Sequence, residues 1–158
     1  LKQEWNERAS SAAVASPYEA LILASIVERE TAVAEERPEI AGVFTRRLRL
    51  GMRLQTDPTV IYGLGEEYRG NLTRKHLRDA KNPWNTYQHK GLPPTPIALP
   101  GRDSIRAVLH PKEGESLYFV ATGDGRHAFA ITLEEHNENV RRYQLNRRED
   151  YRSTPASN

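Results

Sequence analysis

Residues 64–101 are rich in glycine, proline and asparagine, which restricts what the rest of the chain can build. Proline removes a backbone N–H and glycine favours turns, so we expect one long loop region here, stiffest at 91–96. Long ordered loops in compact domains are often functional. Regular structure must therefore come from the segments before and after this stretch.

Two helices are expected before it. Ser16 can cap a helix and Pro17 suits the first helical position, which predicts a helix from about 17 to 34. A second helix is predicted over 37–50, where apolar residues repeat at helical spacing and Gly51 fits the C-terminal end.

Shorter elements follow from the same kind of signal. Asp57 and Pro58 predict an N-cap and the first residue of a short helix that is ended by Gly63 and Gly65. Asp103 can cap a further helix, which we expect to run to His110 before a proline stops it.

The last third of the chain predicts a hairpin and one more helix. Apolar strands within 117–132 flank a Gly-Asp-Gly turn at 123–125, and Thr132 opens a helix to about 146. The predicted fold class is α+β: a helix-rich domain with a small antiparallel hairpin and a long ordered loop region.

Length and composition set further limits. We expect a lead-in at 1–16, either a short helix or a frayed segment, then one domain at 17–147 and a disordered tail at 148–158. The chain starts with Leu1, so we expect it to be part of a longer protein. It has no cysteine and a net charge of only +2, which argues against thiol chemistry and nucleic-acid binding.

Glu30 is the outstanding polar residue of the first predicted helix. Five apolar residues lie within about 60° of it around the helix: Leu23, Ile26, Val27, Val33 and Ala34. A carboxyl group on an apolar face is desolvated, which raises its pKa and suits a general acid. The alternative is a structural buried carboxylate. Glu28 falls on the opposite face, where we expect solvent.

Several segments together resemble the endolytic murein transglycosylases of the YceG-like family. The matching segments are 24–32, 51–63, 85–87, 91–97 and 117–121. The long uninterrupted match over 51–63 is the most specific of them. The resemblance covers about 18–143 and places the catalytic glutamate at Glu30, with Thr31 where other lytic transglycosylases have serine.

This resemblance implies an activity and a location. The family's substrate is peptidoglycan, whose glycan strands are cut without water at the β-1,4 bond between N-acetylmuramic acid and N-acetylglucosamine, leaving 1,6-anhydro ends. The full-length protein is expected in the inner membrane with this domain in the periplasm, beside peptidoglycan synthases. We expect no cofactor, and no nucleic-acid or membrane contact by this segment.

The segment before the short helix supplies the first candidate substrate-binding residues. Gln55 and Thr56 could hydrogen-bond sugar hydroxyls or position Glu30. Asp57 could also face the substrate, although it most simply caps the helix. If Asp57 instead acted as base or nucleophile with Glu30 as acid, the enzyme would be a hydrolase (a muramidase). A non-catalytic glycan-binding module is the remaining alternative.

The long loop supplies the other candidates. Asn85 and Tyr87 are predicted sugar contacts, the tyrosine offering a stacking face, and the alternative is that both lock the loop. His110, His127 and His136 do not have the spacing of a helical metal site, so we predict no metal and interpret them as structural or rim residues. Family members often carry a threonine after the histidine at 127, where this chain has Ala128.

Overall fold

The computed structural model describes residues 1–145, so the tail predicted at 148–158 lies outside the described residues. The helices are α1 (Lys2–Asn6), α2 (Pro17–Glu30), α3 (Arg37–Leu50), α4 (Asp57–Leu64), α5 (Arg74–Arg78), α6 (Arg102–Leu109) and α7 (Leu133–Val140). Two 3₁₀ turns, η1 (Ala34–Glu36) and η2 (Gly65–Glu67), and a π-helical turn, η3 (Arg141–Leu145), complete the helical part. Strands β1 (Tyr118–Ala121) and β2 (His127–Ala130) pair antiparallel, which confirms the α+β fold class.

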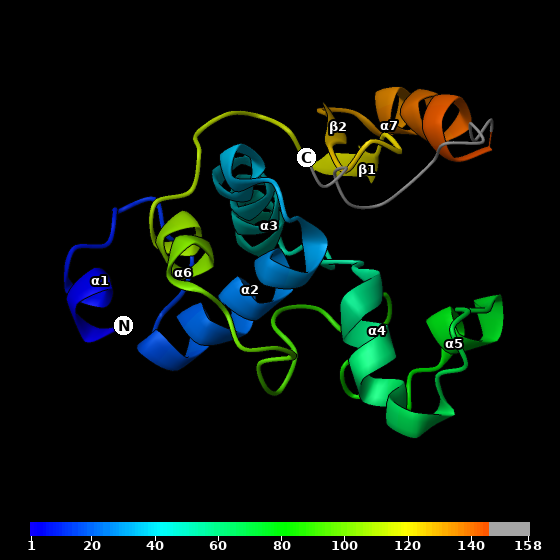
Figure 1. The fold of residues 1–158 in the computed structure, drawn as a ribbon, viewed down its shortest axis with the longest axis horizontal. Helices are drawn as coiled ribbons and strands as arrows, with labels where there is room; N and C mark the ends of the chain where they lie inside the picture. Colours follow the sequence, from blue (N-terminus) through cyan, green and yellow to red (C-terminus); the bar gives the residue numbers. More distant parts are fainter. Residues whose placement is uncertain (146–158) are drawn as a thin grey trace.

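The core lies where α2, α3 and α6 pack on one another (Figure 1). Its fully buried side chains come from all three helices and include Leu23, Ile26, Val27, Ile40, Phe44, Val108 and Leu109. Gly42 permits close packing at the edge of this core, because a Cβ there would lie 2.5 Å from the backbone oxygen of Lys112. Helix α3 therefore lies directly against the segment that follows α6.

Helix α2 begins as predicted and ends earlier. Ser16 Oγ accepts from the Glu19 backbone N–H at 3.1 Å. The predicted end near 34 was wrong, because Thr31 adopts an extended conformation and its hydroxyl accepts from the Val33 N–H at 3.0 Å. Glu30 is thus the last residue of α2, and only Leu23, Ile26 and Val27 of its predicted neighbours share the helix.

Two predicted caps are absent. The N-cap of α4 is Thr56, and Asp57 is the first helical residue, where no side-chain cap forms. Helix α6 begins at Arg102 after Gly101, so Asp103 is not its cap either. Helix α3 spans the predicted 37–50, and Gly51 ends it in the left-handed conformation with φ of 70°.

The long loop region contains one helix that the sequence did not predict. Helix α5 is a single short segment with a capping box, in which the Thr73 hydroxyl accepts from the His76 N–H and His76 Nδ1 accepts from the Thr73 N–H. In Figure 1, α4 and α5 lie together on one side of the core helices.

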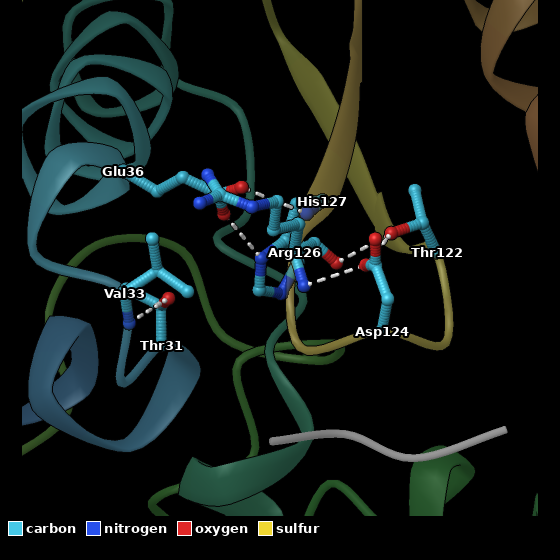
Figure 2. Close-up of polar contacts among 7 residues, drawn as sticks. All are labelled: Thr31, Val33, Glu36, Thr122, Asp124, Arg126 and His127. Carbon is cyan, nitrogen blue, oxygen red and sulfur yellow. Dashed lines mark hydrogen bonds and ion pairs between the residues drawn. The ribbon is translucent and has the colours of Figure 1, made fainter. Parts of the chain in front are cut away.

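The hairpin packs on α3 and is covered by α7. Phe119 of β1 meets Phe44 edge-on, with ring centroids 5.6 Å apart, and His136 of α7 stacks on Tyr118 at 5.0 Å. The predicted turn forms, and Asp124 accepts from the Arg126 N–H at 3.0 Å (Figure 2). Figure 1 shows β1, β2 and α7 as one group at the far side of α3 from α6.

Residues before α2 pack against α6. Of the two options for the lead-in, the structure has a short helix, α1, and the Ala9 N–H donates to Leu109 O at 2.9 Å. Glu4 Oε1 accepts from Arg102 and Arg106 at 3.0 and 3.1 Å. Within residues 1–145, none of the helices is long and apolar enough to cross a membrane.

Candidate active site

Glu30 lies in a cavity of about 970 Å³ between the helical core and the hairpin. Its carboxylate oxygen Oε1 accepts a short hydrogen bond from the Thr56 hydroxyl. The polar and charged residues that line the cavity include Glu30, Arg47, Gln55, Thr56, Asp57, Tyr87, His127 and His136. The cavity therefore brings five of the six predicted site residues together, Glu30 among them, from segments distant in sequence.

Burial raises the pKa of the Glu30 carboxyl above its ordinary value, and the Asp57 charge acts in the same direction. The Thr56 hydrogen bond and the charge of His127 lower this pKa, but burial has the largest effect. The carboxyl is thereby held protonated to higher pH than a solvated glutamic acid. This is the property that a general acid requires.

Thr56 is fixed from both sides. Its backbone N–H donates to the Thr86 hydroxyl at 3.0 Å, and the Thr86 hydroxyl also lies 2.8 Å from that of Thr59. All three threonines are buried. Of the two roles considered for Thr56, the structure shows the contact with Glu30. Gln55, next to it, has a positive φ of 51° and its side chain is exposed at the cavity edge.

Asp57 and Tyr87 form a pair beside Glu30. The Tyr87 hydroxyl donates to Asp57 Oδ1 at 2.6 Å. Burial, together with the charge and hydrogen bond of Asp57, raises the pKa of Tyr87 far above its ordinary value. Tyr87 is therefore a neutral donor across the whole physiological range. The carboxylate of Asp57 receives this hydrogen bond instead of capping α4.

Asn85 does not line the cavity, and its contacts fit the alternative role, which is to lock the loop. Its side chain is fully buried. The Nδ2 group donates to His76 O, Leu77 O and Asp79 O at 3.0 to 3.2 Å, while Oδ1 accepts from the Tyr87 N–H at 3.0 Å. Asn85 locks the loop, and through it fixes the backbone of Tyr87.

Comparison with known proteins identifies the family of this chain. A family model described as the YceG-like family matches residues 1–142. The chain belongs to the YceG-like family. The match includes the segment before α2, which agrees with the packing of that segment on α6.

Relatives and a solved structure agree with the YceG-like assignment. An endolytic murein transglycosylase of Bacillus subtilis is 41% identical over 81% of this chain, and one of Streptococcus pneumoniae is 35% identical over 77%. The crystal structure of a YceG-like protein from Listeria monocytogenes covers 87% of this chain with a TM-score of 0.75 and 42% identity. This chain spans only 35% and 23% of the two relatives and 43% of the solved chain.

Arg47 of this YceG-like domain is a cavity residue that the sequence analysis missed. Its guanidinium donates to Leu117 O at 2.7 Å, to Arg53 O at 2.8 Å and to Gln55 Oε1 at 3.4 Å. It therefore holds the start of the hairpin against the segment that carries Thr56. The signal was available, because Arg47 follows Val43 by four residues and lies on the buried face of α3.

The histidines of the hairpin side have structural contacts and also line the cavity. His127 pairs with Glu36 and His136 stacks on Tyr118, while His110 is exposed outside the cavity. No helical spacing could have indicated this for His127, because it is brought to Glu30 by tertiary packing of β2. Within residues 1–145, no group of three or more acidic or histidine side chains has an arrangement suited to a metal ion.

Proposed function

We propose that this domain is a lytic transglycosylase that cuts peptidoglycan glycan strands between N-acetylmuramic acid and N-acetylglucosamine, leaving 1,6-anhydro ends. The observation that carries the proposal is the environment of Glu30: a carboxyl whose pKa is raised by burial, open to a large cavity, and in contact with a hydroxyl donor. The names of the relatives support the substrate and the endolytic mode of cleavage.

The first step uses Glu30 as an acid. The protonated carboxyl gives its proton to the glycosidic oxygen as the bond between that oxygen and the anomeric carbon breaks, through an oxocarbenium-like transition state. Glu30 is then ionised, and the Thr56 hydroxyl donates to the new carboxylate.

The second step uses Glu30 as a base. The carboxylate takes the proton from the muramic 6-hydroxyl as that oxygen attacks the anomeric carbon, which closes the 1,6-anhydro ring and restores the acid. Water is not consumed, so a second catalytic carboxylate is not required. Asp57, bonded to Tyr87, raises the pKa of Glu30 and so supports its protonated form.

Location and partners belong to this proposal as well. In the full-length protein we place the domain in the periplasm, anchored in the inner membrane and working beside peptidoglycan synthases on nascent strands. These features follow from the family resemblance. Tethering the enzyme at the membrane would limit it to strands that are still close to their site of synthesis.

A pair of neighbouring substitutions tests the activity. We expect Glu30→Gln to lower cleavage of purified glycan strands by at least about 100-fold, the usual scale for losing a general acid. Glu28→Gln is the matched control, since Glu28 lies two residues away, outside the cavity, and should cleave like the wild type. Full cleavage by Glu30→Gln would contradict the proposal, and absence of cleavage by the wild type would favour a non-catalytic glycan-binding module.

A further inference from the structure

Glu36 and His127 form a buried pair beside the site (Figure 2). His127 Nδ1 lies 2.8 Å from Glu36 Oε2, and the His127 backbone N–H donates to Glu36 Oε1 at 3.0 Å. The side chains are only 6% and 9% exposed. Both oxygens of Glu36 thus fix the first residue of β2, and the acceptor-only carboxylate keeps a hydrogen on Nδ1 directed at Glu36.

This pair lies close to Glu30 along the chain and across the cavity. Glu36 ends η1, which follows the end of α2 after a short extended segment, and His127 lines the same cavity as Glu30. The edge of the Phe119 ring packs against the imidazole at 5.4 Å, so the ring is held on a second side. The pair therefore delivers an oriented imidazole from the hairpin to the cavity.

We propose that His127, oriented by Glu36, is a positioning residue for Glu30: it stabilises the carboxylate that Glu30 becomes once its proton has moved to the leaving oxygen. This inference rests on the proposed function. It assigns to the hairpin a direct part in the reaction cycle.

The reaction supplies the reason. Glu30 must begin protonated and then carry a full negative charge in a partly buried, desolvated place, which is costly unless donors or positive charge face it. Thr56 provides one donor from the helical side, and His127 acts on Glu30 from the hairpin side. Asp57 has the opposite effect on Glu30. The site thus contains Asp57, which favours the protonated form of Glu30, and Thr56 and His127, which favour its ionised form.

Stability alone is a poor explanation for this pair. Desolvation offsets most of the attraction between buried charged groups, and apolar residues of similar volume would hold the hairpin as well. The other charged and titratable groups that line the cavity are Arg47, Asp57, Tyr68, Tyr87, Tyr118 and His136. The hydrogen-bond partner of His127 is Glu36, which lies behind it and not among these groups.

The experiment measures cleavage per folded molecule in Glu36→Gln, His127→Gln and the double variant of the full chain. We expect kcat to fall by about 100-fold in His127→Gln and by about tenfold in Glu36→Gln, the scale of removing a preorganised stabilising group. The double variant should be no slower than His127→Gln, because Glu36 acts through His127. Glu4→Gln is the control: it breaks a comparably buried acidic contact, with Arg102 and Arg106, far from the cavity.

A second measurement does not depend on activity. Carboxyl NMR titration of Glu30 should give a higher pKa in His127→Gln than in the wild type, because the charge of His127 lowers it. An unchanged kcat and an unchanged Glu30 titration in His127→Gln would overturn the inference. The Glu36–His127 pair would then have a purely structural role, like the contact of Glu4 with Arg102 and Arg106. Failure of the proposed function itself would look different. The wild type would not cleave glycan strands, while the Glu30 pKa would still differ between the wild type and His127→Gln.

Discussion

At the scale of residues, Glu28 and Glu30 show how two neighbouring carboxyls acquire different roles. Glu30 ends α2 with its carboxyl in the cavity and its pKa raised by burial. Glu28 lies on the other face of the helix, where its Oε1 accepts from the Gly101 N–H at 2.5 Å. That face is covered by the loop, rather than by solvent as we had expected. Glu28 thus fastens the loop, and Glu30 is free to react.

The contact between Thr56 and Glu30 can be tested by Thr56→Val, which keeps the shape and removes the hydroxyl. The hydroxyl lowers the pKa of Glu30, so its loss should raise that pKa further. Because Glu30 must start protonated, the alkaline limb of kcat/KM should move to higher pH. The maximum rate should fall about tenfold or more, since the ionised intermediate loses a donor. A limb that moves to lower pH would contradict this account.

Glu30 could be predicted from sequence because its apolar neighbours repeat at helical spacing within one helix. For Thr56 the sequence left two roles open, and it did not indicate that His127 lines the same cavity as Glu30. Thr56 and His127 lie 26 and 97 positions away from Glu30, and no local pattern decides whether such distant residues meet. Asp57 was misjudged for a related reason. Its local signal fits an N-cap, but Tyr87, brought close by the loop, provides a stronger partner.

At the scale of elements, the long loop is an ordered part of the site. The Asn85 side chain fixes the loop through four hydrogen bonds with backbone groups of other loop residues. Asn82 adds a hydrogen bond from Nδ2 to Val60 O at 3.2 Å. Trp84 Nε1 donates to Thr95 Oγ1 at 3.1 Å, which ties two parts of the loop together. Tyr87 is therefore presented to the cavity by a rigid support.

Asn85→Ala tests this role of the loop. The substitution leaves three carbonyl groups without their donor in a buried place, so the free energy of unfolding should fall by about 2 kcal/mol or more. Chemical denaturation measures the change, and activity should fall with it as Tyr87 loses its position. Unchanged stability combined with weaker binding of glycan strands would instead make Asn85 a sugar contact.

Elements with strong local signals were predicted well. Proline and serine set the start of α2, Gly51 ends α3, and the 123–125 turn closes the hairpin. The end of α2 was missed because the Thr31 hydroxyl accepts a hydrogen bond from the nearby Val33 N–H, and the helix does not continue. Helix α5 was missed because its residues carry no apolar periodicity, and its capping box lies in a stretch that otherwise predicts loop.

At the scale of the whole molecule, the cavity depends on parts that are far apart in the sequence. The helical core supplies Glu30 and Arg47, the loop supplies Tyr87, and the hairpin and α7 supply the opposite wall. Arg47 joins these parts, because it binds both the hairpin and the segment before α4. The sequence predicted each part, but not that they enclose one cavity.

Burial of Glu30 also links folding to pH. The pKa of Glu30 is higher in the folded protein than in the unfolded chain, where it is about 4.3. Protonated Glu30 therefore contributes its full share to the free energy of unfolding below that value, and this share is lost as pH rises through the folded pKa. Glu30→Gln cannot ionise, so its melting temperature should exceed that of the wild type at pH 8, with the difference shrinking towards pH 4. Melting curves across this range measure it, and a difference that grows with falling pH would contradict the burial of an acid.

The central claim is that Glu30 cuts the glycan strand with the muramic 6-hydroxyl, rather than water, as the acceptor. Mass spectrometry of purified sacculi digested in ¹⁸O-labelled water tests it most directly. The account predicts 1,6-anhydro ends without label from the wild type, and none from Glu30→Gln. Reducing ends that carry the label would show hydrolysis instead, since a reducing end contains one water more than an anhydro end and is about 18 mass units heavier in ordinary water. That result would contradict the account and would assign Asp57 the role of base or nucleophile.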